Sequence, residues 1–431
     1  MTRPGHNLLS RLNFSGPKKE AANSSKSDYS TQFVLGLLSQ LNSGHLKITL
    51  PDGKVREFGN KTDTLQADIQ IFDWKVFKDL RTHGDIGFAE SYIRGEWDSG
   101  DLKAILELAV RNRTILEKAI YGSWLGSILY RLRHWLRDNT KSGSRKNIHA
   151  HYDLGNAFYS LWLDPSMSYS SAWFAKGDKQ TLVDAQRAKI KRILDSLNTQ
   201  PGDHILEIGC GWGGVMEEAL LSNRSITGLT LSTEQKSFAE NRLKNLQTMA
   251  SNQGRFEVRL QDYRDCQEQF DGIASVEMFE AVGEKHWAEY FQTLAKCLKS
   301  SGKACIQTIV IADHLFERYR HSTDFIQQYV FPGGMLPSRA SFKDSAAKAG
   351  LQIEDEFAFG GDYAKTLCIW RDNFNQQLQD VRKLGFDEAF IRLWNFYLMY
   401  CAAGFTERNI DVVQFTLSHS TPKASNDALT P

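Results

Sequence analysis

The chain has 431 residues, of which 41% are hydrophobic and 24% are charged, and its formal net charge is +1. This length predicts about two domains with a large core, and the near-zero charge excludes a general electrostatic attraction to nucleic acid or to a membrane. Residues 1–18 lack the apolar core of a signal peptide, and the six cysteines show no metal-ligand spacing. We expect a cytoplasmic protein with reduced thiols, no metal and no nucleic-acid partner.

The N-terminal part predicts a tail followed by a small domain. Residues 1–32 are rich in polar residues without an apolar period, and residues 421–431 have the same character, so both are predicted to be disordered. Within residues 33–115, the turn Pro51-Asp-Gly53 separates strand-like segments at 45–50 and 55–58. Segments 73–80 and 102–109 have helical spacing. The pattern predicts a small mixed α/β domain and indicates no function by itself.

A basic amphipathic segment forms the predicted linker at residues 116–146. Between residues 121 and 137 an apolar face is flanked by arginines, and Trp124 and Trp135 lie in the same segment; the face consists of Leu125, Ile128, Leu129, Leu132 and Leu136, and the flanking residues are Arg131, Arg133 and Arg137. Such a helix suits an anionic lipid surface. It would equally suit a contact between domains or within a homodimer, because amphipathicity does not identify the partner.

Residues 147–420 predict a large α/β domain with a doubly wound, Rossmann-like sheet. Apolar segments at 205–208, 226–231, 255–260, 271–276 and 303–311 alternate with helical ones. A further strand is predicted at 365–370, and long helices at 372–384 and 388–402. Residues 312–338 form an insertion that could roof a pocket, which predicts a helical lid.

A glycine-rich turn at 205–214 is the first indication of a ligand. An apolar strand leads into Gly209, Gly211 and Gly213, which allow the backbone to approach a ligand closely, and a helix begins after them. Gly209, Gly211 and Gly214 also fit the G-x-G-x-x-G spacing of a dinucleotide site. S-adenosylmethionine is favoured because Glu207 lies inside the strand, where it could reach the methionyl ammonium. The acid that a dinucleotide's ribose requires is absent from the end of the second strand. A turn without a ligand is the remaining alternative.

Several ordered motifs resemble the cyclopropane-fatty-acyl-phospholipid synthase family from about residue 45 onward. They lie at residues 86–97, 147–156, 167–173, 261–265, 278–283, 329–337 and 362–363. The resemblance implies a one-carbon transfer from S-adenosylmethionine to the double bond of an unsaturated phospholipid acyl chain. It also implies an enzyme peripherally associated with the inner membrane.

The resemblance places cofactor contacts in four segments. They are Tyr169 and Ser170; Gly209, Cys210 and Gly211; Thr230, Leu231 and Gln235; and Gln261 and Asp262. For Thr230 and Gln235 the alternative is ordinary strand-end and helix-cap chemistry.

The resemblance also implies a bound bicarbonate that acts as the base. Glu280 and Tyr363 match two of its holders, and Ile309 matches a backbone contributor. The chain departs from the family at three positions: Ser171 replaces a cysteine, Gln307 replaces a histidine, and Ala281 replaces the histidine that follows the glutamate. Neutral donors still bond an anion, although more weakly than charged ones. Cys401 matches a cysteine near the family's active site, and a buried helix residue is the alternative interpretation.

Three functions remain open from the sequence. The first is a lipid-modifying transferase that forms a cyclopropane, or instead a methyl-branched or methylated unsaturated chain. The second is a methyltransferase for a soluble small molecule. The third is a relative that binds the lipid or the cofactor but has lost catalysis.

Overall fold

The computed structural model describes residues 29–120, 154–177, 179–249 and 254–420. The predicted tail 421–431 and the basic segment 121–137 lie outside these ranges, as do residues 1–28. Residues 29–32 are also predicted to be disordered, but they form the first turn of a helix. The chain forms two compact units. Unit 1 comprises Met1–Ala188, Val310–Leu336 and Phe359–Val412, and unit 2 comprises Lys189–Ile309, Pro337–Ala358 and Val413–Pro431.

The N-terminal part of unit 1 contains both strands and helices, as predicted for residues 33–115, but it shares one compact unit with later helical segments. It contains α2 (Tyr29–Leu38), β1 (His45–Thr49), β2 (Val55–Gly59), β3 (Gln66–Ile71), α3 (Lys75–Ile93), β4 (Trp97–Asp98), α4 (Leu102–Arg111) and α5 (Arg113–Ile120). The sheet order is β2-β1-β3-β4. The pairing of β1 with β2 is antiparallel, which confirms the predicted hairpin.

The rest of unit 1 is helical. Its elements are α8 (Asn156–Tyr159), the first turns of α9 (Leu182–Ser196), α13 (Asp313–Tyr319), a π-helix (Ile326–Val330), α15 (Gly360–Gln376), α16 (Leu378–Lys383) and α17 (Glu388–Thr406). The strand predicted at 365–370 is wrong, because this stretch lies inside α15. The buried side chains of Tyr363, Leu367, Trp370 and Phe374 recur every three or four residues, which is the helical period.

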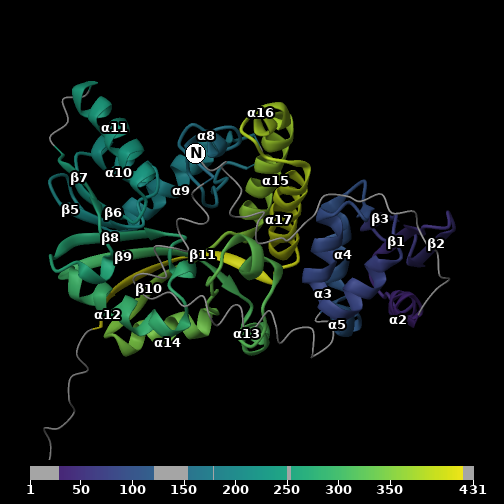
Figure 1. The fold of residues 1–431 in the computed structure, drawn as a ribbon. Coiled ribbons are helices and arrows are strands. Elements are labelled where there is room, and N and C mark those ends of the chain that lie inside the picture. Colours follow the sequence, from purple (N-terminus) through teal and green to yellow (C-terminus); the bar gives the residue numbers. More distant parts are fainter. Residues whose placement is uncertain (1–28, 121–153, 178, 250–253, 421–431) are drawn as a thin grey trace, which may run out of the picture. The chain divides into compact units, whose positions relative to one another are not determined.

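Unit 2 is built on a seven-stranded sheet of order β10-β11-β9-β8-β5-β6-β7. The predicted strands are confirmed as β5 (His204–Ile208), β6 (Ser225–Thr230), β7 (Phe256–Leu260), β8 (Phe270–Val276) and β9 (Leu298–Ile311). Figure 1 shows α10 (Gly214–Leu221) and α11 (Thr233–Met249) on one side of the strands. On the other side lie α12 (Trp287–Cys297) and α14 (Arg339–Lys348). Helices on both faces explain why the central strands are apolar throughout.

Two strands of this sheet have no counterpart in the sequence prediction. They are β10 (Leu351–Ala358) and β11 (Ile410–His419), which pair antiparallel. Most side chains of β10 are exposed or half-buried, so its sequence lacks a continuous apolar run. Such an edge strand carries little of the signal on which sequence prediction depends.

The strand order fixes where a ligand can bind. From β5 the chain proceeds through β6 to β7 on one side and then continues with β8 on the other side of β5. In open α/β sheets, ligands bind outside the carboxyl ends of the strands where the order reverses. The carboxyl ends of β5 and β8 are therefore the expected location of the site in unit 2.

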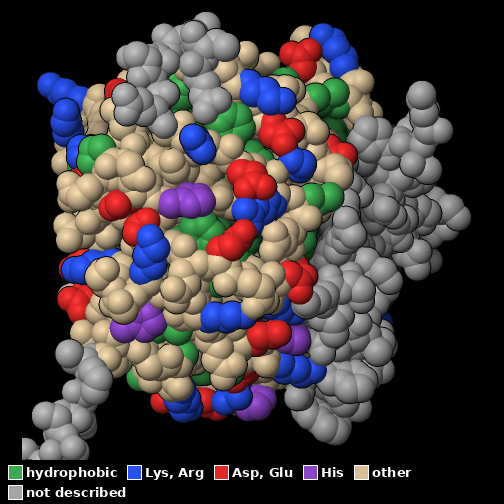
Figure 2. All heavy atoms as spheres, turned by 90° about the vertical axis from the view of Figure 1, so that its left-hand side faces the viewer, with side chains coloured by type: hydrophobic (Ala, Val, Ile, Leu, Met, Phe, Trp, Pro, Cys, Tyr) green, Lys and Arg blue, Asp and Glu red, His purple; other side chains and the backbone are tan. Residues whose placement is uncertain are grey.

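A membrane span requires a long apolar helix, and a charged patch requires side chains of one sign gathered together. In the described ranges, no helix is both long and apolar enough to cross a bilayer. On the face drawn in Figure 2, Lys and Arg side chains are interspersed with Asp and Glu, as the net charge of +1 predicts.

Candidate active site

The turn after β5 has the open backbone that the sequence predicts. Gly209, Gly211 and Gly213 have φ angles of 83°, 50° and 84°, a region that side chains other than glycine rarely adopt. The amides of Gly209 and Cys210 donate to the carbonyl of Leu229 over 3.0 and 2.9 Å, which fixes the turn to β6. A Cβ placed on Gly211 would meet nothing within 4 Å. The turn is thus rigidly held and open at Gly211.

Glu207 brings an acid to the base of this turn. Its side chain is buried, and its Oε2 has no hydrogen-bond partner among the described residues. Burial raises the pKa of Glu207 well above its usual value, although the charge of Lys189 opposes the shift. An unsatisfied buried carboxyl oxygen carries a free-energy cost, and a cationic ligand group would relieve it.

The end of β6 carries Thr230 and Gln235, which bond to each other. The Thr230 hydroxyl donates to Oε1 of Gln235 over 2.9 Å and accepts from the amide of Ser232 over 3.1 Å. This is the strand-end and cap chemistry that the sequence left open as an alternative. Leu231 between them is half-buried.

The end of β7 brings Gln261 and Asp262 to the same edge of the sheet. The amide of Gln261 donates to the carbonyl of Thr230 over 3.1 Å. Asp262 caps a short 3₁₀ helix (Tyr263–Asp265) and pairs with the Arg264 guanidinium at 2.7 Å. Unit 2 therefore holds every predicted cofactor residue except Tyr169 and Ser170, at or just after the carboxyl ends of β5, β6 and β7.

Glu280 lies in a 3₁₀ turn (Phe279–Ala281) just after β8. Its Oε1 accepts from the Ile309 amide over 2.5 Å, and its Oε2 is buried without a partner among the described residues. Burial, and secondly the charge of Glu277, raise the pKa of Glu280 to about 8. A carboxyl group with so high a pKa can hold or accept a proton near neutral pH.

Gln307 has a different environment from the one the resemblance implies. Its fully buried amide donates to Oε1 of Glu277 over 2.8 Å and accepts from Nε2 of Gln414 over 3.0 Å. The Gln307 carbonyl also accepts from the Glu277 amide over 2.7 Å. The side chain is thus committed to a carboxylate that the sequence analysis did not single out.

The remaining predicted residues belong to unit 1. Tyr169 and Tyr397 join through their hydroxyls at 2.8 Å, and the Tyr169 ring lies 5.5 Å from that of Trp370. The Ser170 carbonyl accepts from Gln186 over 2.8 Å. The Ser171 hydroxyl is fully buried and donates to the Ala172 carbonyl over 2.9 Å.

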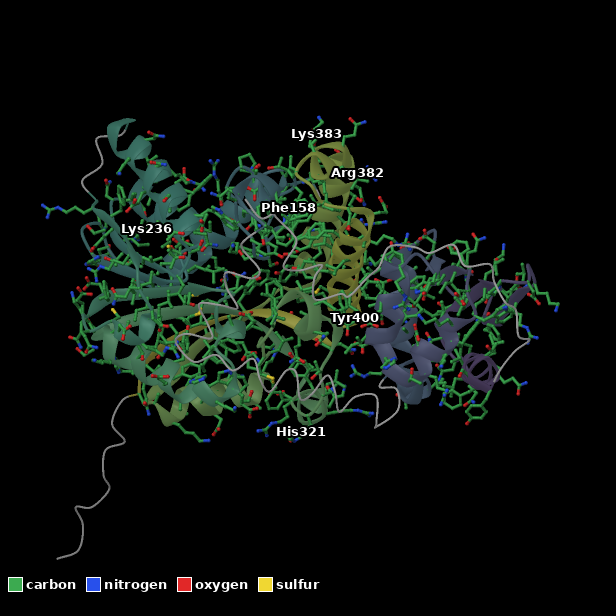
Figure 3. All side chains as sticks on the ribbon, in the orientation of Figure 1. Phe158, Lys236, His321, Arg382, Lys383 and Tyr400 are labelled. Atoms are coloured by element: carbon green, nitrogen blue, oxygen red, sulfur yellow. The ribbon has the colours of Figure 1, made fainter. Side chains whose placement is uncertain are left out.

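Tyr363 and Cys401 lie near the same aromatic group. The Tyr363 ring contacts that of Phe405 at 4.4 Å. Burial, and to a lesser degree the charges of Cys401 and Tyr363, raise the pKa of Tyr397 well above its usual value. Burial raises the pKa of the Cys401 thiol as well, so this thiol is a poor nucleophile. Tyr400, labelled in Figure 3, precedes it on α17.

The predicted site therefore divides between the two units. Unit 2 brings together the cofactor turn, Glu280 and Gln307, and unit 1 brings together Tyr169, Tyr363 and Cys401. Sequence reasoning missed Glu277, Trp370 and Tyr397. Tyr397 lies four residues before Cys401 on α17, and this helical spacing could have identified it. The union of the two groups into one site stays a prediction.

The residues of unit 2 fit S-adenosylmethionine. The open backbone at Gly211 accommodates a ligand in contact with the chain, and Glu207 offers an unsatisfied acid to the methionyl ammonium. They fit bicarbonate poorly, because the Gln307 amide already bonds a carboxylate and Glu280 is a second one.

Comparison with known proteins supports the same chemistry. The family described as mycolic acid cyclopropane synthetase matches residues 139–415. Tuberculostearic acid methyltransferase UfaA1 from Mycobacterium tuberculosis is 39% identical over 79% of this chain and 80% of its own length. Cyclopropane-fatty-acyl-phospholipid synthase from Escherichia coli is 34% identical over 82% of this chain and 88% of its own length.

The fold is also similar to that of a solved structure. Mycolic acid cyclopropane synthase CmaA1, complexed with SAH and CTAB, is 32% identical and superimposes with a TM-score of 0.58. The match covers 63% of this chain and 97% of that one.

Proposed function

Because the chain belongs to the mycolic acid cyclopropane synthetase family, we propose that it transfers a one-carbon unit to the double bond of an unsaturated acyl chain in a membrane phospholipid. It is an S-adenosylmethionine-dependent methyltransferase. One observation carries the proposal: the open turn after β5 and the buried carboxyl of Glu280 after β8 lie at the carboxyl ends of adjacent strands.

The chemistry requires a dry, cation-tolerant site. When bound, S-adenosylmethionine supplies an electrophilic methyl group. An alkene is a weak nucleophile, so the protein must exclude water and align the double bond. The product of addition is a carbocation, which aromatic faces stabilise. Tyr169, Trp370, Tyr363 and Phe405 form such an aromatic group within unit 1.

Ring closure is the expected outcome. The cation closes to a cyclopropane when a base removes a proton from the new methyl group, and Glu280 provides an acid–base group in unit 2. Loss of a proton from the acyl chain gives a methylated unsaturated product instead, and the 39% identity to a tuberculostearic acid methyltransferase favours this as the second candidate. A saturated methyl branch additionally requires a hydride donor.

Mass spectrometry of lipids made with a methyl-deuterated donor tests the product. A cyclopropane keeps two donor deuteriums, whereas a methylated chain that has lost a chain proton keeps three. When the product keeps two deuteriums, proton NMR of the same lipid distinguishes a cyclopropane ring from a double bond. A product with three deuteriums would overturn ring formation and leave methyl transfer intact.

A soluble substrate is the main alternative, and liposomes test it. We propose that the enzyme acts while peripherally attached to the inner membrane on its cytoplasmic side, where its phospholipid substrate lies. Activity should then require vesicles that contain unsaturated phospholipid. If a soluble acceptor is turned over without vesicles as fast as phospholipid in vesicles, a lipid substrate is contradicted. Cofactor binding without any product would indicate a relative that has lost catalysis.

A further inference from the structure

Glu277 has a backbone conformation that requires an explanation. Its φ is 50°, a left-handed conformation that costs a residue with a side chain about 1–3 kcal/mol and that clusters at functional sites. It follows β8 directly, at the carboxyl end where the strand order reverses. The next residue along this loop, Met278, packs at the cofactor turn: a Cβ on Gly209 would lie 2.8 Å from its Cγ.

A chain of side-chain amides from β11 and β9 ends on the Glu277 carboxylate. Gln307 donates to it from β9, Gln414 on β11 donates to Gln307, and the Glu277 amide donates back to the Gln307 carbonyl. Gln307 and Gln414 are both fully buried. A buried amide chain that ends on one carboxylate oxygen positions that carboxylate precisely.

Glu277 and Glu280 bond to the same strand two residues apart. Glu277 meets the side chain of Gln307, and Glu280 meets the amide of Ile309. Burial, and secondly the charge of Glu277, raise the pKa of Glu280 to about 8, so Glu280 mostly holds a proton at neutral pH. Glu277 instead accepts a hydrogen bond from the Gln307 amide, which suits a carboxylate. A further anion beside this pair would be repelled.

We propose that Glu277 is the proton acceptor of the reaction, and that the Glu277–Glu280 pair takes the place of bicarbonate. This inference rests on the proposed function. The π electrons of the alkene form the new C–C bond to the methyl group, and the S–C bonding electrons remain on sulfur. The carbocation then loses a proton to a carboxylate oxygen of Glu277, and the C–H electron pair forms the ring bond or a new double bond. No oxidant or reductant is needed, and water later takes the proton from the carboxylic acid.

The test compares two variants in carbonate-free buffer under argon with unsaturated phospholipid vesicles. Glu277→Gln keeps the size of the side chain but cannot accept the proton. Glu277→Gly removes the carboxylate and also relaxes the left-handed backbone, which offsets part of the cost of leaving the Gln307 amide without its acceptor. Both should lower kcat about 100-fold or more. Their affinity for S-adenosylmethionine, measured by calorimetry, should stay within about threefold of the wild-type value.

Asn223→Gly is the matched control. Asn223 also has a left-handed backbone, with φ 57°, and its replacement relaxes the backbone without removing a carboxylate, so activity should be unchanged. Wild-type turnover should not respond to added bicarbonate, and bicarbonate should partly restore Glu277→Gly, in which space for a small anion is created.

Two outcomes would overturn the inference. One is wild-type activity that is lost without bicarbonate and returns with it. The other is full turnover by Glu277→Gln or Glu277→Gly in carbonate-free buffer. In both, methyl transfer itself survives, so the proposed function stands. If wild-type protein methylates no lipid under any condition, the proposed function fails and this inference fails with it.

Discussion

Glu280 links the acid–base chemistry of the site to the stability of the protein. Its pKa is raised from 4.5 to about 8 by burial and by Glu277, so the folded state holds its proton more tightly than the unfolded chain does. Its contribution to stability is therefore greatest below about pH 4.5 and is lost as the pH rises through about 8.

Replacing Glu280 with Gln should remove this pH dependence. Relative to wild type, Glu280→Gln should gain roughly 2–5 °C in melting temperature between pH 5 and pH 9, while turnover falls strongly and the affinity for S-adenosylmethionine is kept. Glu317→Gln is the control, because the Glu317 side chain is 74% exposed. Calorimetric melting of the three proteins across this range measures the effect. If the melting temperatures of Glu280→Gln and wild type differ by the same amount at every pH, ionisation of Glu280 does not destabilise the folded state.

Gly211 tests whether the turn after β5 holds the cofactor. Gly211→Val places a branched side chain in open space at φ 50°, where a bound ligand would be displaced. The affinity for S-adenosylmethionine should fall at least about 30-fold, which corresponds to roughly 2 kcal/mol. Gly53→Val carries a comparable backbone penalty, since a Cβ on Gly53, which has φ 80°, would also meet nothing within 4 Å, yet Gly53 lies in the β1–β2 turn of unit 1. Unchanged calorimetric affinity in Gly211→Val would refute the assignment.

At the level of elements, the sequence predicted what periodicity and glycine spacing determine. The apolar strands β5, β6 and β8 were found because helices bury both of their faces. The edge strand β10 was missed because most of its side chains are exposed or half-buried. Glu277 was missed for a different reason. Its left-handed backbone and its bond to Gln307, 30 residues away, depend on strand pairing that no local pattern encodes.

Helix α17 is tied to the N-terminal domain within unit 1 by Arg392. Its guanidinium donates to the carbonyls of Tyr92 and Trp97 over 2.5 and 2.8 Å and pairs with Asp98 at 3.2 Å. It also stacks on the Tyr92 ring at 3.9 Å. Since α17 carries Tyr397 and Cys401, this tie helps to fix the unit 1 part of the predicted site.

Loss of this tie should destabilise unit 1. Arg392→Gln should cost about 2–4 kcal/mol, because buried carbonyls lose charged donors. Arg382→Gln should cost less than about 1 kcal/mol, because Arg382, labelled on α16 in Figure 3, is half-exposed and its ion pair with Glu388 lies at the surface. Urea unfolding followed by tryptophan fluorescence compares them. Equal midpoints would mean that Arg392 contributes no more than a surface ion pair.

For the whole molecule, a net charge of +1 leaves membrane attraction to local features. The face in Figure 2 has interspersed charges, whereas residues 131–137, outside the described part of the chain, concentrate Arg131, Arg133 and Arg137 beside an apolar stripe. Each basic residue near an anionic surface contributes about 1 kcal/mol. Replacing all three with Gln should therefore weaken binding to anionic vesicles by about 100-fold at low salt, and the difference should shrink as salt screens the charges.

A triple variant with the same change in net charge separates a local effect from a global one. Lys191, Lys348 and Lys383 have side chains that are 72%, 74% and 75% exposed, and their replacement with Gln should change vesicle binding little. Sedimentation with vesicles of graded anionic lipid content, at two salt concentrations, measures both variants. If the two bind equally, net charge controls attachment and the segment 121–137 contacts protein rather than lipid. If only the arginine variant is weakened, the attachment is local, and turnover on vesicles should fall with it while cofactor affinity stays constant.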